Sequence, residues 1–306
     1  MQIERRGVHM ATTINWFPGH MKKTQREIKE NLKLVDAVIE IRDARIPRSS
    51  ANPDIDKLCG NKPRLILLNK SDLTENKVTK AWIRELSKDN VLAIEVNCLK
   101  GQGLNQIKPA LEKLLKEKHD RLRAKGLVKI MTRVMVVGIP NVGKSTFINK
   151  MAKNNIAKTG DRPGVTKSKQ WIKTPLGIEM LDTPGVLWPK FEDDTTALNL
   201  AFTGAIKDEI MDTEELSYLL VKRLQENYSE ELMTRYKLEE VCEDPYDTLN
   251  TIARKRGCLM SGGRINYDRI STILLDEFRG GVIGNISLER PDDIKDKGEN
   301  LDETTN

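Results

Sequence analysis

The 306-residue sequence has few cysteines and few aromatic residues, and it lacks long apolar runs. Its four cysteines, Cys59, Cys98, Cys242 and Cys258, form no C-x-x-C pair, so neither a zinc site nor a disulfide framework is predicted. No apolar run approaches the roughly 20 residues that span a bilayer, and the amino terminus lacks the apolar core of a signal peptide. We therefore expect a cytoplasmic protein that does not contact membranes. We also expect a monomer.

Charge is unevenly distributed along the chain. The net charge is +6, yet residues 289–306 hold seven acids and three bases, so residues 1–288 carry +10. A basic body fits a polyanionic partner such as RNA, although many soluble proteins are equally basic without one. Residues 289–306 are polar and poor in apolar side chains, which predicts a disordered acidic tail.

Short β-rich runs alternate with helical patterns between residues 35 and 182. This alternation predicts an α/β domain with a doubly wound, mostly parallel sheet. Strands are expected at Ala37–Ile41, Leu65–Leu68, Leu92–Val96, Val134–Val137 and Glu179–Leu181. Helices are expected at Lys22–Leu34, Val78–Leu86 and Leu104–Leu122, where apolar residues recur at spacings of three and four.

Strand patterns nearly vanish after Pro189. The remaining chain predicts helices at Thr213–Tyr228, Ser229–Tyr236, Pro245–Arg256 and Tyr267–Phe278. We expect an α/β domain over residues 14–190 and a small all-α domain over residues 191–288.

A phosphate-binding loop is predicted at Gly138–Ser145, which matches G-x-x-x-x-G-K-[ST] between an apolar strand and a helical pattern. In such a loop, backbone N–H groups surround the β-phosphate, the lysine neutralises the β- and γ-oxygens, and the hydroxyl binds magnesium. These roles fall to Lys144 and Ser145. The predicted nucleotide contacts in this segment are Asn141, Val142, Gly143, Lys144, Ser145 and Thr146.

Two further motifs predict the magnesium and γ-phosphate contacts. Asp182 follows an apolar strand, where its carboxylate can hold magnesium through water, and the N–H of Gly185 can meet the γ-phosphate. Thr166 lies between this motif and the phosphate-binding loop, in a segment rich in glycine and proline, and is predicted to bind magnesium. Lys144 and Gly185 are thus expected to act on the reacting phosphate.

Guanine recognition is predicted at Asn69-Lys70-Ser71-Asp72, an NKxD motif that follows the strand pattern Leu65–Leu68. Asp72 can accept from the ring N–H and the exocyclic amine of guanine, a donor pair that adenine does not offer. Asn69 and Lys70 would support the loop and pack on the base. Asn97 and Cys98, after the next strand, are expected to pass under the base edge.

The order of these motifs is permuted, because in Ras-like GTPases the phosphate-binding loop comes before NKxD, whereas here Lys70 precedes Lys144. Eight segments together resemble the circularly permuted ribosome biogenesis GTPase A family (YlqF/RbgA type). They are NWFPGHM, DARIP, NKSD, GIPNVGKST, PGVT, DTPGVLWPKFED, TGAIKD and KRGCLMSGG. The resemblance covers about Ile14 to Leu288, which leaves residues 1–13 as an N-terminal extension.

The resemblance implies a bacterial, cytoplasmic, ribosome-associated GTPase that binds GTP, GDP and magnesium. It also implies binding to the precursor of the large ribosomal subunit and its rRNA, and promotion of late assembly. His20 takes a catalytic role by this resemblance. Val186 occupies the place of the water-orienting Gln of Ras-like enzymes, so hydrolysis by the chain alone should be slow and stimulated by the subunit. Asn141 either coordinates a potassium ion or stabilises its loop.

A basic cluster of the predicted helical domain is the candidate RNA contact. It comprises Arg254, Lys255, Arg256 and Arg264, next to Gly262-Gly263. The alternative is a solvated basic helix end that complements the helix dipole. Two other functions stay open: a nucleotide-gated RNA-binding module with incidental hydrolysis, and a GTPase of tRNA modification or translation.

Overall fold

The computed structural model describes residues 26–153, 171–183 and 193–294. Of these, residues 193–286 form one compact unit, and the remainder, including residues 287–294, forms the other. The division falls close to the boundaries expected from the sequence, at residues 191 and 288.

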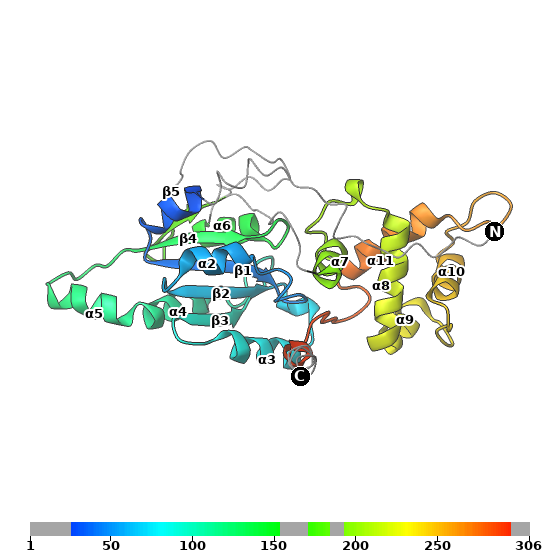
Figure 1. The fold of residues 1–306 in the computed structure, drawn as a ribbon, viewed down its shortest axis with the longest axis horizontal. Coiled ribbons are helices and arrows are strands. Elements are labelled where there is room, and N and C mark those ends of the chain that lie inside the picture. Colours follow the sequence, from blue (N-terminus) through cyan, green and yellow to red (C-terminus); the bar gives the residue numbers. More distant parts are fainter. Residues whose placement is uncertain (1–25, 154–170, 184–192, 295–306) are drawn as a thin grey trace, which may run out of the picture. The chain divides into compact units, whose positions relative to one another are not determined.

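A six-stranded sheet forms the centre of the first unit (Figure 1). Its strand order is β3-β2-β1-β4-β6-β5, and all neighbouring pairs are parallel except β5 with β6. The strands are β1 Ala37–Asp43, β2 Arg64–Asn69, β3 Val91–Glu95, β4 Thr132–Gly138, β5 Trp171–Lys173 and β6 Ile178–Asp182. The predicted mostly parallel sheet is therefore confirmed, and the short antiparallel β5 is an addition to it.

The chain crosses the sheet in two opposite directions, and helices form most of the connections between its strands. The chain runs outward from β1 to β3, and then returns past β1 to β4 and outward again to β6. Because such crossovers are right-handed, the reversal places the helices of the two halves on opposite faces of the sheet. Residues 26–32 are also helical. The helices are α2 Pro53–Cys59, α3 Asn76–Leu86, α4 Ile107–Leu114, α5 Lys116–Ala124 and α6 Lys144–Ala152.

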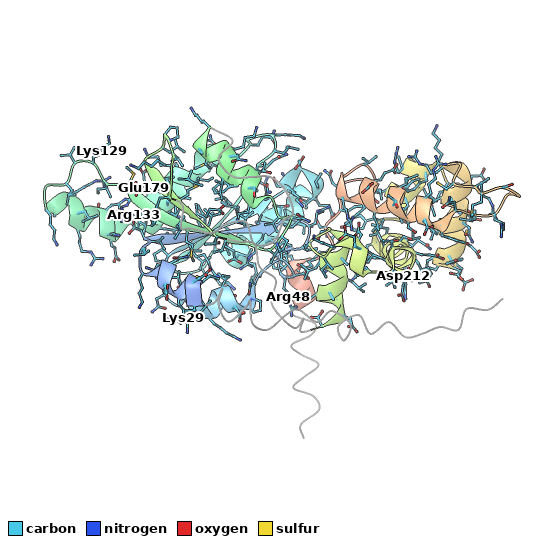
Figure 2. All side chains as sticks on the ribbon, turned by 90° about the horizontal axis from the view of Figure 1, so that it is seen from above. Lys29, Arg48, Lys129, Arg133, Glu179 and Asp212 are labelled. Carbon is cyan, nitrogen blue, oxygen red and sulfur yellow. The ribbon has the colours of Figure 1, made fainter. Side chains whose placement is uncertain are left out.

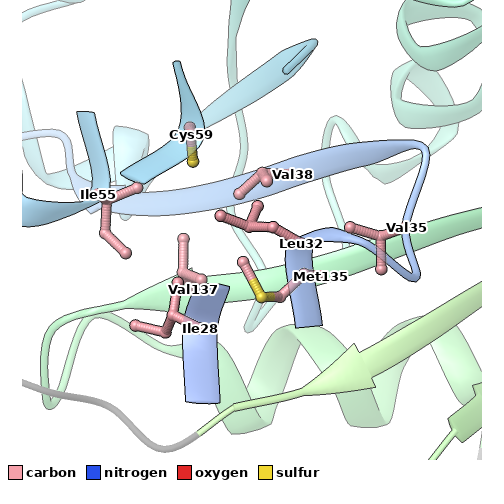
Figure 3. Close-up of a cluster of buried hydrophobic side chains, with 8 residues drawn as sticks. All are labelled: Ile28, Leu32, Val35, Val38, Ile55, Cys59, Met135 and Val137. Atoms are coloured by element: carbon pink, nitrogen blue, oxygen red, sulfur yellow. The ribbon is translucent and has the colours of Figure 1, made fainter. Parts of the chain in front are cut away.

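One hydrophobic cluster fixes the helix of residues 26–32 and α2 against β1 and β4 (Figure 3). It consists of Ile28, Leu32, Val35, Val38, Ile55, Cys59, Met135 and Val137. Burying each large aliphatic side chain contributes about 1.5–3 kcal/mol. Burial also raises the pKa of the Cys59 thiol to about 11, so this cysteine acts as an apolar packing group. The cluster thus gives β4, the strand that leads into the phosphate-binding motif, a rigid support.

The segment after the helical unit returns to the first unit, which differs from the disordered tail expected from residue 289. The carboxylate of Glu289 accepts hydrogen bonds from the backbone N–H groups of Arg48 (2.7 Å) and Ser49 (3.0 Å). Trp82 Nε1 donates to the carbonyl oxygen of Glu289 at 3.0 Å. A 3₁₀ turn, η5, then spans Pro291–Ile294. These long-range hydrogen bonds order the beginning of the tail, which its local composition could not reveal.

The second unit is helical, as the sequence predicts. Its helices are α7 Asp194–Phe202, α8 Thr213–Asn227, α9 Ser229–Tyr236, α10 Pro245–Lys255 and α11 Tyr267–Arg279. Side chains of Asp212, Asp244 and Asn266 accept from backbone N–H groups at the starts of α8, α10 and α11, which satisfies donors that a helix start leaves unpaired. Within the described ranges, no helix is both long and apolar enough to cross a bilayer.

Candidate functional site

The predicted motifs meet at one edge of the sheet, because the carboxyl ends of parallel strands lie side by side. Strands β2, β1, β4 and β6 end there at Asn69, Asp43, Gly138 and Asp182. The chain leaves β1 in one direction along the sheet and β4 in the other, so the crevice at their ends is a topological switch point. Open α/β sheets bind ligands at such points.

The loop after β4 has the conformation of an anion-binding turn. Gly143 caps α6 with a φ of 97°, and a Cβ atom there would lie 2.4 Å from Asn69 Nδ2, so only glycine fits. The first helical hydrogen bond of α6 runs from Phe147 N to the carbonyl oxygen of Gly143 at 2.9 Å. The N–H groups ahead of it lie at the positive end of the helix dipole, which is suited to phosphate.

Lys144 and Asp182 join this loop to the end of β6. Lys144 Nζ lies 2.6 Å from Asp182 Oδ1, and both side chains are largely buried. Ser145 and Thr146 are half-buried in the first turn of α6. A hydroxyl and a carboxylate beside a phosphate-binding turn are the hard oxygen donors that magnesium prefers.

The described residues contain no group of three or more His, Cys, Asp or Glu side chains that could hold a metal ion. Magnesium, however, usually keeps several waters and takes other ligands from bound phosphates. A hydroxyl from Ser145 and a water-mediated contact from Asp182 therefore suffice for the protein's share, and the residues fit this ion.

Asn69 links the base-recognition motif to two other loops. Its Nδ2 donates to the carbonyl oxygen of Val142 at 2.6 Å, and its Oδ1 accepts from the backbone N–H of Cys98 at 2.9 Å. The side chain is buried. Both hydrogen-bonding ends of the amide are therefore used to hold the phosphate-binding loop and the loop after β3 in one arrangement.

Lys70 and Asp72 each form an ion pair with an oppositely charged side chain of the first unit. Lys70 has a left-handed backbone, with a φ of 62°, and its Nζ lies 2.9 Å from Asp43 Oδ2. Asp72 Oδ2 lies 3.1 Å from Lys100 Nζ, in a pair that is more exposed to solvent. The carboxylate of Asp72 is thus partly exposed, and a ligand can reach it.

Asp43 is a site residue that the sequence reading missed. Its carboxylate also accepts from Arg45 Nε at 3.0 Å and from the backbone N–H of Arg45 at 3.0 Å. Burial alone would raise the pKa of Asp43, but the charges and hydrogen bonds of Arg45 and Lys70 outweigh it and lower that pKa, so the group is ionised. The available signal was a carboxylate directly after an apolar strand, the pattern that identified Asp182.

The loop after β3 is fixed by its own hydrogen bonds. Asn97 exchanges backbone hydrogen bonds of 3.0 Å with Gln102, and its Oδ1 accepts from Lys100 N at 2.9 Å. Cys98 is buried, and burial raises the pKa of its thiol to about 12, so it stays neutral. Leu99, the residue after Cys98, is 74% exposed. Asn97 and Cys98 therefore shape the loop, and Leu99 presents an apolar surface beside the predicted base site.

The predicted RNA contacts lie in the second unit, where they are not equivalent. Arg256 Nη2 lies 2.6 Å from Glu277 Oε1, and Arg235 pairs with the same carboxylate. Burial tends to raise the pKa of Glu277, but the hydrogen bonds and charges of these arginines lower it overall. Arg256 thus has a structural partner, whereas Arg254 and Arg264 are exposed and make no ion pair within the described part of the chain.

Of the predicted site residues, Asn69, Lys70, Asp72, Asn97, Cys98, Asn141–Thr146 and Asp182 come together at the sheet edge. Asn141 is exposed, with a φ of 60°. His20, Thr166 and Gly185 lie outside the described residues.

Comparisons with known proteins identify relatives along nearly the whole chain. A family described as "50S ribosome-binding GTPase" matches residues 133–248. "Ribosome biogenesis GTPase A" of Bacillus licheniformis is 52% identical over 281 residues, which cover 92% of this chain and 99% of that protein. "Mitochondrial ribosome-associated GTPase 1" of Bos taurus is 32% identical over 90% of this chain and 88% of its own.

Two solved structures are also similar. The GNP-bound YlqF of T. maritima matches with a TM-score of 0.60 and 30% identity, over 88% of this chain and 98% of that chain. The GDP-bound form matches with a TM-score of 0.61 and 29% identity, over 87% and 100% of the two chains. Sequence and fold thus point to the same group of proteins.

Proposed function

The chain belongs to the ribosome biogenesis GTPase A family, and on this premise we propose that it binds the precursor of the large ribosomal subunit and promotes its late maturation. It is a GTPase that acts in ribosome biogenesis. The observation that carries the proposal is the meeting of the NKxD loop, the phosphate-binding loop and the end of β6 at one switch point, joined by Asn69 and by the Lys144–Asp182 pair.

Guanine selectivity belongs to Asp72. Its carboxylate accepts from the ring N–H and the exocyclic amine of guanine, and GTP competes with Lys100 for that carboxylate. Asn69 holds the loops on either side in register, and Lys70, anchored by Asp43, packs beside the base. Asn97 and Cys98 form the floor of this part of the site.

Phosphate binding belongs to the loop from Asn141 to Thr146 and to the start of α6. Lys144 neutralises the β- and γ-oxygens, so its partner changes from Asp182 to phosphate. Magnesium, which GTPases generally use, would be held by Ser145 directly and by Asp182 through water, and it would neutralise negative charge on the phosphates. Thr166 adds a magnesium contact, and the N–H of Gly185 meets the γ-phosphate.

Asn141 is assigned to a potassium ion beside the phosphates. Asn141 is exposed, and it lies in the phosphate-binding loop with a left-handed backbone. A monovalent cation there would add positive charge at the place where other GTPases use an arginine.

Water activation needs a group that the phosphate site does not supply. The residue after Gly185 is Val186, which has no hydrogen-bonding side chain to orient water. His20 takes this role, since a neutral imidazole can accept a proton near pH 7. Hydrolysis is therefore slow for the chain alone and faster on the large subunit, where the catalytic arrangement is completed.

Contact with rRNA is assigned to Arg254, Lys255 and Arg264, exposed cations of the second unit. Arg256 belongs to the same cluster, but it also pairs with Glu277. Cations without a carboxylate partner are suited to phosphates, and each phosphate contact makes binding more sensitive to salt. The family relationship does not favour incidental hydrolysis in a passive RNA-binding module, or a role in tRNA modification.

Binding to purified large ribosomal subunits tests this function. The full chain should sediment with subunits more strongly with a non-hydrolysable GTP analogue than with GDP. The double variant Arg254→Glu/Arg264→Glu should bind at least about tenfold more weakly, because reversed charges repel phosphates. The matched control Lys207→Glu/Lys222→Glu changes two exposed cations of the same unit and should bind normally. Equal binding with both nucleotides would contradict a GTP-controlled assembly factor.

A further inference from the structure

Positive charge is concentrated in one short part of the first unit. Nine Lys and Arg and three Asp and Glu lie between Lys108 and Arg133, a net charge of +6 within 26 residues. Residues 1–288 together carry +10, so less than a tenth of that length holds more than half of its net charge. The concentration calls for a structural explanation.

All these cations except Arg133, which lies in β4, belong to a protrusion formed by α5 and the return segment of residues 125–131, with α4 at its base packed against β2 and β3. Figure 1 shows α5 extending away from the sheet, and Figure 2 shows Lys129 close to α5, beyond Arg133 and Glu179, which lie near the starts of β4 and β6. His119 is the buried residue of α5. Its Nε2 lies 3.4 Å from Thr132 Oγ1, and Lys118 pairs with Asp36. One side of α5 is thus anchored, and the rest faces solvent.

Most cations of this protrusion have no internal function. Lys108, Lys113, Lys116, Lys125 and Lys129 are exposed and make no ion pair in the part of the chain that the structure describes. Arg123 reaches Asp120 only at 3.5 Å, with both side chains more than half exposed, a pair worth little to stability. Folding therefore does not explain why so many like charges gather here.

The return segment is also unusual in its apolar exposure. Val128 is 99% exposed, and Leu127 and Met131 are 46% and 44% exposed. When a partner covers exposed apolar side chains of a protruding segment, their removal from water stabilises the complex. Uncompensated cations and exposed apolar groups therefore occur together, on the connection that leads from α5 into β4.

We infer that this basic protrusion is a second RNA-docking surface, one that binds the phosphate backbone of rRNA through the GTPase domain. The inference rests on the proposed function for the identity of the RNA, but on different residues from the cluster in the helical unit. The lysines bind phosphates, and Leu127, Val128 and Met131 are covered by the docked strand. Because α5 has only Leu122 and Ala124 as apolar residues, it lacks the continuous apolar face of a helix that lies on a lipid surface.

The test compares two triple variants of the full chain. Lys113→Gln/Lys125→Gln/Lys129→Gln removes three charges of the protrusion, and Lys57→Gln/Lys77→Gln/Lys80→Gln removes three exposed charges of α2 and α3 as a matched control. Binding to purified large subunits with a non-hydrolysable GTP analogue is measured over a series of salt concentrations. The protrusion variant should bind at least about tenfold more weakly, with a log–log salt slope shallower by about 2, since each lost phosphate contact removes about 0.7–0.9. The control should match the wild type.

Thermal unfolding and GTP affinity of both variants should equal those of the wild type, which shows that the site is intact. If the wild type binds subunits but both variants match it in affinity and slope, the protrusion is not an RNA surface, and the proposed function stands. If the wild type itself does not bind subunits, the proposed function fails and this inference fails with it. Vesicles of phosphatidylglycerol and phosphatidylcholine provide the second arm. Loss of vesicle binding by the protrusion variant, with subunit binding unchanged, would assign the surface to lipid and overturn the inference.

Discussion

The side-chain amide of Asn69 donates a hydrogen bond of 2.6 Å to the backbone carbonyl of Val142, across 73 residues of sequence. Asn69 ends the strand that precedes guanine recognition, and Val142 lies in the phosphate-binding loop. One buried amide thus connects the two halves of the predicted nucleotide site. In a permuted chain, this contact joins motifs whose order along the sequence is reversed.

Replacing Asn69 with Ala should weaken both folding and nucleotide binding. The change leaves the carbonyl of Val142 and the N–H of Cys98 without partners in a buried place, at a cost of about 1–3 kcal/mol in the free energy of unfolding. Urea unfolding and titration with GTP and GDP measure the two effects. Asn76→Ala, at an exposed position of α3, is the control and should change neither. Unaltered GTP affinity in Asn69→Ala would show that the connection does not support the site.

Replacing Asp72 with Asn should change the preferred base. The substitution replaces an acceptor with an amide donor that faces the guanine donors, so GTP affinity should fall at least about a hundredfold. Xanthine nucleotides carry a carbonyl at that position and should bind better than to the wild type. Competition titrations with both nucleotides measure the ratio. Undiminished GTP binding would remove Asp72 from the base site.

Potassium should accelerate hydrolysis if Asn141 holds it beside the phosphates. Turnover in potassium buffer should exceed turnover in sodium buffer at equal ionic strength, because sodium is a smaller ion and does not fit a site shaped for potassium. Asn141→Ala should remove the difference. Identical rates in the two buffers would leave Asn141 as a loop-stabilising residue.

The sequence predicted most of the first unit, because each strand is a short apolar run that ends at a recognisable motif. The differences between the predicted and the observed elements are local. The stretch Leu104–Leu122 was expected as one helix, but it is a 3₁₀ turn followed by α4 and α5, with a break at Leu115. Strand β5 has only three residues, too few to show an alternating pattern. Its place depends on pairing with β6, a contact that local sequence does not encode.

Tertiary contacts account for the remaining differences at the site. Asp43 has a recognisable position after β1, but its partner Lys70 lies 27 residues further along the chain, and only the sheet brings them together. Arg256 looked equivalent to Arg254 in a basic run, and its pairing with Glu277 follows from the packing of α10 against α11. The hydrogen bonds of Glu289 to residues 48 and 49 join parts of the chain 240 residues apart. The sequence therefore predicted the chemistry of each motif, but it did not predict the distant residues that hold each motif in place.

Replacing His20 with Ala should separate catalysis from binding. GTP affinity and association with the large subunit should persist, whereas subunit-stimulated turnover should fall at least about tenfold, which corresponds to about 1.4 kcal/mol of transition-state stabilisation. Single-turnover assays with saturating subunits measure this loss. Full stimulated turnover in His20→Ala would mean that the ribosome or another residue positions the water.

If the large ribosomal subunit completes the catalytic site of this GTPase, GTP turnover of the wild-type chain should depend on whether purified large subunits are present. Hydrolysis by the chain alone should be slow, since Val186 cannot orient water, and the rate should be at least about tenfold higher with large subunits. Small subunits at equal concentration should have no effect. Turnover that is the same with large subunits, with small subunits and with neither would show that the large subunit does not complete the catalytic site.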